Sequence, residues 1–146
     1  MGEAREVLDR MTAATMSNDT AALEACYAED AVAVTPDRGE ITGREAIISF
    51  LSQWGQAFPD SAFEYLERYE AGNVAIDEGF INATNTGQLQ MPTGESAPPT
   101  GRPVRHRVCG VARVENGLIT SHHFYWDQLD LLDQLGLLPA PDPKTL

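Results

Sequence analysis

The sequence has few positively charged residues. Its 146 residues include 10 Lys and Arg against 22 Asp and Glu, which gives a formal net charge of −12. Nucleic acids and anionic membrane surfaces are themselves negative and would repel such a chain. We therefore exclude both as partners and expect the acidity to favour solubility.

Cysteines, long apolar runs and several catalytic motifs are also scarce or missing. Cys26 and Cys109 are far apart and lack metal-like spacing, so we expect reduced core residues and no metal site. The chain has no apolar run of about 18 residues and no cationic leader, which excludes a membrane span and a secretory signal. A cytoplasmic location is therefore expected. A glycine-rich phosphate loop and a G-x-S-x-G motif are absent, and we expect no cofactor.

Helical patterns fill the first part of the chain. Residues 3–16 carry Val7, Leu8 and Met11 at helical spacing. Asn18 or Asp19 can cap a short second helix.

A third helix is predicted after residue 42. Thr42 and Glu45 have the spacing of a capping box. One apolar face follows and carries Ile47, Leu51, Trp54 and Phe58. Trp54 and Phe58 can belong to the core or contact a ligand, and we include both as candidate substrate-binding residues.

Strand patterns dominate the next 70 residues. Strands are predicted near 63–69 and 73–86, with Asp77 and Glu78 as charges at a strand edge, and residues 87–101 read as a loop. Helices followed by strands indicate one α+β domain over residues 1–146, with helices on one face of a mostly antiparallel sheet. A helix across a curved sheet leaves a pocket at the open end.

The strongest local signal is a hairpin around Asn116-Gly117, because both central residues of a type I′ turn need a positive φ. Counting outward from a two-residue turn predicts opposed pairs along both strands. The predicted pairs are Glu115–Leu118, Val114–Ile119, Ala112–Ser121, Gly110–His123, Val108–Tyr125 and His106–Asp127.

This register predicts which residues face the cavity, because directly opposed residues share one face of a sheet. The face with His106 and Asp127 lacks arginine, and we assign it to the cavity together with His123 and Tyr125. A carboxylate beside an imidazole can transfer protons, so Asp127 and His106 are the candidate catalytic residues. His123, about 13 Å away along the strand, and Tyr125 are candidate substrate-binding residues.

Structural alternatives stay open for these side chains. Asp127 directly precedes an apolar helical segment and can be its N-cap. His106 can be a structural histidine. His122 is expected on the outer face, beside the arginines.

Several motifs together resemble the SnoaL-like polyketide cyclases, of the nuclear-transport-factor-2-like superfamily. The matching stretches are Asp77-Glu78-Gly79, Thr84-Asn85-Thr86-Gly87, Pro98-Pro99-Thr100-Gly101-Arg102, Asn116-Gly117-Leu118-Ile119, Tyr125-Trp126-Asp127-Gln128 and Gln134-Leu135-Gly136. The resemblance implies a cone in which a curved antiparallel sheet wraps around three N-terminal helices, followed by a short C-terminal helix, and a homodimer.

The resemblance also implies cofactor-free ring closure with an aspartate acting as acid and base, and Asp127 is the position that looks like it. Asn85 stands where the family often has histidine in its T-x-T-G motif. An asparagine there can orient a carbonyl but cannot move a proton, so Asn85 is a candidate substrate-binding residue.

Three functions follow from these patterns. The first is a cofactor-free enzyme, cyclase-like or isomerase-like, that uses Asp127 on an apolar or polycyclic carbonyl compound. The second is a non-catalytic protein that binds a similar small molecule. The third is a dimerisation module, in which Trp126 and Phe124 form the subunit contact.

Overall fold

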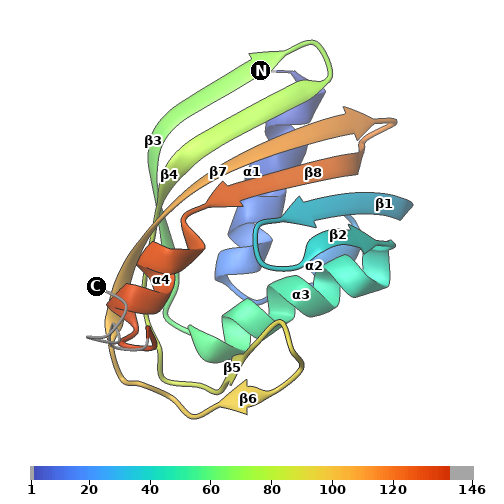
Figure 1. Ribbon diagram of the computed structural model, residues 1–146. Coiled ribbons are helices and arrows are strands. Elements are labelled where there is room, and N and C mark those ends of the chain that lie inside the picture. Colours follow the sequence, from blue (N-terminus) through green and yellow to red (C-terminus); the bar gives the residue numbers. More distant parts are fainter. Residues whose placement is uncertain (1, 139–146) are drawn as a thin grey trace, which may run out of the picture.

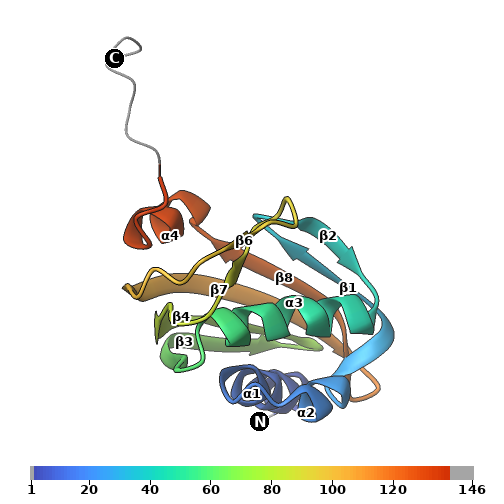
Figure 2. The ribbon, with the colours of Figure 1, turned by 90° about the horizontal axis from the view of Figure 1, so that it is seen from below.

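The computed structural model describes residues 2–138 and confirms the α+β fold. A curved six-stranded sheet has the strand order β2-β1-β8-β7-β4-β3, and helices α1 and α3 lie on its concave side (Figures 1 and 2). The predicted domain, 1–146, includes Met1 and residues 139–146, which lie outside the described residues. The elements are α1 Glu3–Met16, α2 Thr20–Glu24, β1 Tyr27–Thr35, β2 Gly39–Thr42, α3 Arg44–Ala57, β3 Ala62–Ala71, β4 Val74–Thr84, β5 Leu89–Gln90, β6 Ser96–Ala97, β7 Pro103–Glu115, β8 Leu118–Trp126 and α4 Gln128–Gln134.

The first two helices form as the sequence predicts. Val7, Leu8 and Met11 of α1 are buried against the sheet, and each buried apolar side chain of this size contributes roughly 1.5–3 kcal/mol. Asp19 caps α2, because its side chain accepts a hydrogen bond from the Ala22 backbone N–H at 3.1 Å.

Helix α3 buries the predicted apolar face, but the predicted capping box is wrong. The N-cap is Gly43, with φ 95°, and no side chain caps this end. Thr42 belongs to β2, and the Gly43 N–H donates to the Ala31 carbonyl at 2.8 Å, which ties the helix start to β1. Glycine fits here because this backbone conformation is unfavourable for other residues.

The β7–β8 hairpin begins as predicted and then departs from the predicted register. Asn116 and Gly117 both have positive φ, and Glu115–Leu118 and Val114–Ile119 are opposed. The register then shifts, so that Arg113 opposes Ser121. The extra residue is in β8, which makes this a β-bulge.

The bulge moves every later residue of β8 to the opposite face from the one predicted. Gly110 opposes Phe124 and Val108 opposes Trp126. The predicted pairs Ala112–Ser121, Gly110–His123, Val108–Tyr125 and His106–Asp127 are therefore wrong. The β7 half of the face assignment holds, whereas on β8 the inward side chains are those of His122, Phe124 and Trp126.

Two further features differ from the predictions. Strands β1 and β8 pair in parallel, whereas the other pairs in the described sheets are antiparallel. Residues 87–101, predicted as a loop, contain the short β5–β6 ladder, which lies by α3 (Figure 2). None of the helices between residues 2 and 138 has the length and apolar character needed to cross a membrane.

Candidate active site

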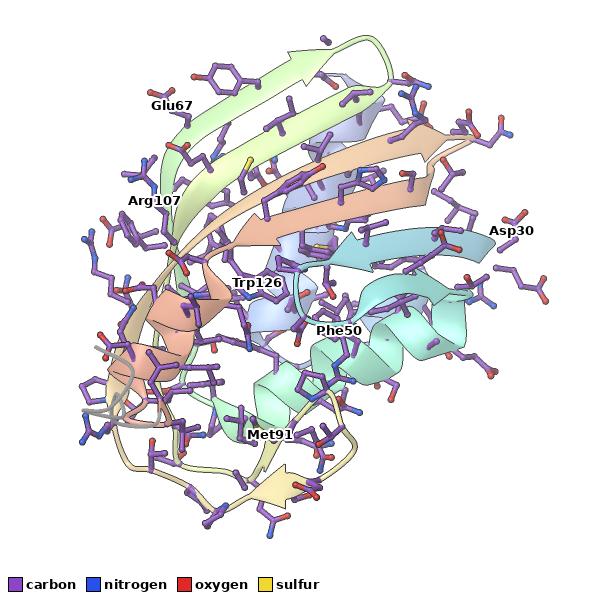
Figure 3. All side chains as sticks on the ribbon, in the orientation of Figure 1. Asp30, Phe50, Glu67, Met91, Arg107 and Trp126 are labelled. Carbon is purple, nitrogen blue, oxygen red and sulfur yellow. The ribbon has the colours of Figure 1, made fainter. Side chains whose placement is uncertain are left out.

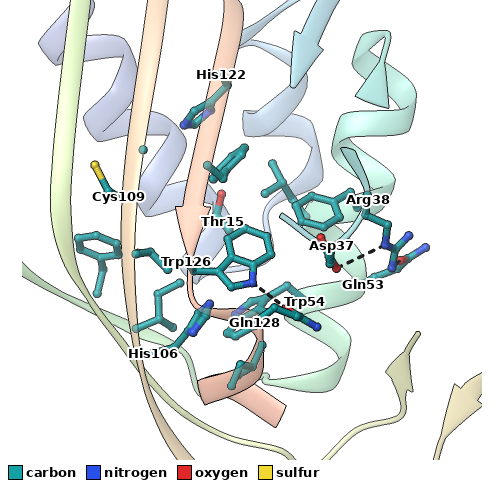
Figure 4. A pocket seen from close by; sticks show the side chains of 18 of the residues that line it. Thr15, Asp37, Arg38, Gln53, Trp54, His106, Cys109, His122, Trp126 and Gln128 are labelled. Atoms are coloured by element: carbon teal, nitrogen blue, oxygen red, sulfur yellow. Dashed lines mark hydrogen bonds and ion pairs between the residues drawn. The ribbon is translucent and has the colours of Figure 1, made fainter. Parts of the chain in front are cut away.

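The concave side of the sheet and the helices enclose a mainly apolar cavity of about 150 Å³ (Figure 4). A cavity of this size can hold a small aromatic molecule. Figure 3 shows Trp126 between β8 and α3, where its ring stacks 6.4 Å from that of Phe50, while Arg107 lies on the other side of the sheet. The lining residues discussed below are Asp37, Arg38, Gln53, Trp54, Asp77, His106, Cys109, Gly110, His122, Phe124 and Trp126.

Asp77 is a buried carboxylate in this apolar lining. It is 4% exposed, and it lies opposite Gly110 of the neighbouring strand. Arg5 Nη2 forms an ion pair with Asp77 Oδ1 at 2.6 Å, whereas Oδ2 has no hydrogen-bond partner among the described residues. Burial raises the pKa of Asp77, and the positive charge of Arg5 offsets part of that rise.

His122 and Tyr27 form a buried pair. The Tyr27 hydroxyl is 2.7 Å from His122 Nδ1, and the two side chains are 0% and 2% exposed. The His122 ring stacks on Phe124 with centroids 3.9 Å apart. Burial lowers the pKa of His122 to about 3 and raises that of Tyr27, so both groups are neutral at neutral pH.

His106 is a second neutral imidazole in the cavity wall. It is 2% exposed and packs between Trp54, with centroids 5.4 Å apart, and Trp126, with centroids 5.6 Å apart. Burial lowers its pKa to about 4, although Asp130 and Asp127 act in the opposite direction. No described side chain or backbone group is hydrogen-bonded to its ring.

A charged pair lies at another part of the lining (Figure 4). Arg38 Nε is 3.6 Å from Asp37 Oδ2, and Arg38 Nη2 donates to Gln53 Oε1 at 3.0 Å. Asp37 Oδ1 accepts a hydrogen bond of 2.8 Å from the Thr35 hydroxyl. Both oxygens of Asp37 therefore have partners within the protein, whereas Asp77 Oδ2 has none among the described residues.

Asp127 occupies the alternative position that the sequence allows. Its side chain is the N-cap of α4 and accepts a hydrogen bond from the Asp130 backbone N–H at 3.0 Å. It is exposed and lines a second hollow with His106 and Tyr125, not the main cavity. The predicted cavity-facing pair of Asp127 and His106 is wrong because the bulge shifts the register, and the catalytic role of Asp127 stays a prediction.

The bulge also changes the position of its β8 neighbours. His123 and Tyr125 do not line the main cavity, and Tyr125 is 55% exposed. Phe124 and Trp126 do line it, so the face predicted for these two residues is wrong, and a subunit contact through them stays a prediction.

Asn85 is held entirely by backbone and loop groups. Its Nδ2 donates to the carbonyls of Ala57 and Gly87, at 3.1 and 3.0 Å. Its Oδ1 accepts from the backbone N–H and the hydroxyl of Thr100, at 2.8 and 2.9 Å. The side chain is 0% exposed and does not line the cavity, so its predicted position beside a ligand is wrong.

Trp54 and Phe58 have different positions. Trp54 lines the cavity, and its Nε1 donates to Ser61 Oγ at 3.0 Å. Phe58 is fully buried behind it, with ring centroids 4.1 Å apart, and does not line the cavity. Phe58 is therefore a core residue, and of this pair only Trp54 is placed to contact a ligand.

The sequence-based prediction missed Asp77 and His122 as cavity residues. Asp77 was predicted to be a charge at a strand edge, whereas β4 lies between β7 and β3 and buries Ala75 and Asp77. The glycine in the neighbouring strand could have indicated this position. Glycine within a strand marks a close approach or a space, and Gly110 lies directly opposite Asp77.

Comparison with known proteins shows which family the sequence matches. A model of the SnoaL-like domain matches residues 8–122, which is most of the chain. No curated protein sequence matches.

Solved structures share the fold at low sequence identity. A protein from Jannaschia sp. CCS1, proposed to be a SnoaL-like polyketide cyclase, aligns with TM-score 0.81 and 14% identity over 94% of both chains. IdmH from Streptomyces antibioticus, a proposed polyketide cyclase, aligns with TM-score 0.76 and 22% identity over 92% of this chain and 99% of its own. An epoxide hydrolase of the LEH-like type from M. tuberculosis aligns with TM-score 0.71 and 19% identity over 91% and 89%.

Proposed function

The chain belongs to the SnoaL-like domain family, and on that premise we propose that it catalyses proton transfer on an apolar carbonyl compound of polyketide type, without a cofactor. The cavity is the reaction site, and Asp77 is the acid and base. One observation carries this proposal: Asp77 is a buried carboxylate in an apolar cavity, with Oδ1 ion-paired to Arg5 and Oδ2 without a hydrogen-bond partner among the described residues.

The environment of Asp77 suits a base that removes a proton from carbon. A carboxylate in water is too weak a base for this task, and burial strengthens it. Burial raises the pKa of Asp77, and the positive charge of Arg5 offsets part of that rise. An unpartnered oxygen is also free to approach the substrate.

The reaction has two steps. Asp77 takes a proton from the carbon next to the substrate carbonyl, which leaves an enolate. The enolate then attacks a second carbonyl of the same molecule to form a carbon–carbon bond, and the resulting alkoxide takes the proton back from Asp77. Isomerisation differs in the second step only, because the proton returns to another carbon.

Two aspartates compete with Asp77 for this role. Asp37 also lines the cavity, but it is held by Thr35 and Arg38. Asp127 is an exposed helix cap that does not line the main cavity.

A direct test measures exchange of carbon-bound protons. The bicyclic aryl ketone 2-tetralone is incubated with the protein in D₂O, and loss of its α-proton signals is followed by ¹H NMR. The wild-type chain should accelerate exchange, and Asp77→Asn should slow it by about 100-fold or more. Asp127→Asn is the matched control, because asparagine also caps helices. If Asp127→Asn abolishes exchange and Asp77→Asn keeps it, the assignment is wrong.

A second candidate function is simple binding, which the apolar lining of the cavity favours. In that case the wild-type chain binds 2-tetralone but does not accelerate its exchange. Mass spectrometry of small molecules retained during purification would identify the natural ligand in either case. The homodimer implied by the family resemblance stays a prediction, which light scattering of the purified protein tests.

A further inference from the structure

The buried Tyr27–His122 pair determines which nitrogen of His122 carries the proton. Tyr27 is fully buried, so its hydroxyl needs a hydrogen-bond acceptor within the protein. Among the described residues, the one group within hydrogen-bonding distance of this hydroxyl is His122 Nδ1, at 2.7 Å. Tyr27 therefore donates to Nδ1, and a neutral imidazole that accepts at Nδ1 must carry its hydrogen at Nε2.

The Nε2 atom of His122 lies over Gly110, at the cavity. A Cβ atom added to Gly110 would lie 3.2 Å from Nε2, which is closer than an ordinary contact, and the other nearby atom within 4 Å also belongs to the His122 ring. Glycine therefore keeps a side chain away from the N–H group and leaves the cavity side of this position free. Figure 4 shows the His122 ring among the lining side chains. No described residue accepts a hydrogen bond from Nε2. A polar N–H in an apolar cavity requires a partner, and a ligand can supply it.

Asp77 borders the same open space from the other side. It opposes Gly110 across the β4–β7 ladder, and Cβ positions of opposed residues are about 5 Å apart. A ligand atom above Gly110 therefore lies between a carboxylate and an N–H donor. In a ketone, the acidic carbon and the carbonyl oxygen are separated by two bonds, which suits this arrangement.

We propose that the Nε2–H group of His122 binds the carbonyl oxygen of the ligand and the enolate oxygen that forms from it, and that Tyr27 is the positioning residue that fixes this tautomer. The inference rests on the proposed function for the enolate, but binding of the carbonyl does not require catalysis. It names the ligand class as ketones with an α-hydrogen. Hydrocarbons of the same shape leave the N–H unpaired and are selected against.

His122 acts here as a hydrogen-bond donor and not as a proton carrier. Its ring remains neutral at neutral pH because burial lowers its pKa to about 3. The stacked Phe124 ring holds the imidazole plane. A fixed donor that needs no reorientation stabilises a developing negative oxygen effectively.

The first test reads the tautomer in the wild-type protein. The chain has three histidines, so long-range ¹H–¹⁵N correlation spectra at pH 7.5 can resolve each ring. The expected pattern for His122 is a protonated Nε2 and a bare Nδ1. A protonated Nδ1 would overturn the inference, and this measurement does not depend on whether any variant folds.

The second test compares 2-tetralone with tetralin, which has the same rings without the carbonyl. Tryptophan fluorescence reports binding of each, because Trp54 and Trp126 line the cavity. Wild-type protein should prefer the ketone by about tenfold, and the double variant Tyr27→Phe/His122→Phe should lose this preference while still binding tetralin. Tyr27→Phe alone should weaken the preference for the ketone.

Asp77→Asn separates this inference from the proposed function. It should abolish proton exchange and keep the preference for the ketone. If exchange persists in Asp77→Asn but the preference follows His122, the proposed base is wrong and the His122 contact stands. Equal affinity of the wild-type chain for ketone and hydrocarbon would sink the His122 contact.

Discussion

Acidification should destabilise this protein through its two buried imidazoles. His106 and His122 are each 2% exposed, and burial lowers their pKa values from 6.5 to about 4 and about 3. Between pH 6.5 and pH 4 the unfolded chain therefore binds more protons than the folded chain. The free energy of unfolding falls with falling pH in this window, and the full contribution is present above pH 6.5.

The expected size of the effect follows from the shifts. One unit of pKa corresponds to about 1.4 kcal/mol, so lowering the pH from 7.5 to 5.0 should remove about 2 kcal/mol for each ring. The two rings together remove about 4 kcal/mol, a large part of the 5–15 kcal/mol typical of a folded domain.

Urea denaturation at pH 7.5 and pH 5.0 measures this loss. His106→Phe removes one imidazole without leaving a hydrogen-bond partner unpaired among the described residues. Tyr27→Phe/His122→Phe removes the other imidazole together with its hydroxyl partner. Comparison with the wild-type chain at each pH cancels the effect of carboxylate titration on stability, because all three proteins have the same carboxylates. Each variant should gain about 2 kcal/mol relative to wild type on going from pH 7.5 to 5.0.

A difference between variant and wild type that does not change with pH would refute the reasoning, because it would mean that the rings titrate normally in the folded protein. A relative loss of stability in the variants at pH 5.0 would reverse the sign of the linkage. Either result would indicate that water or a charged group lies beside these imidazoles.

Two predictions concern residues outside the cavity. Asn85→Ala should reduce the free energy of unfolding by about 3 kcal/mol, because it leaves several buried hydrogen-bonding groups unpaired; thermal denaturation measures this, with Asn82→Ala, whose amide bonds Glu64 at the surface, as the control that should change little. Asp127→Ala should reduce it by about 1 kcal/mol through loss of the α4 cap. An Asp127→Ala protein with wild-type stability in urea would argue against the capping contact.

The fold could be predicted because its signals are local or periodic. The apolar face of α3 and the Asn116-Gly117 turn depend on residues that are near one another in sequence. The parallel pairing of β1 with β8 could not be read in this way, since nothing close in sequence to β1 specifies a partner about ninety residues later. The prediction of Thr42 as a helix cap was wrong because the backbone of Gly43 is held by its hydrogen bond to the Ala31 carbonyl.

The site was predicted less well because it depends on register. Both sets of alternating residues from His122 to Trp126 are aromatic, so hydrophobic alternation could not reveal which set faces inward. Asp77 was missed because its burial is compensated by Arg5, a residue on a distant helix. His106 was found because its strand, β7, carries arginines on the other face.

The bulge in β8 bears on how such cavities can change during evolution. Along this strand, His122, Phe124 and Trp126 line the cavity, while His123 and Tyr125 lie on the other face of the sheet. Deletion of a single residue at the bulge would exchange one set for the other in one genetic event. Relatives that differ in length at this hairpin can therefore present different chemistry on the same scaffold without a single substitution in the lining.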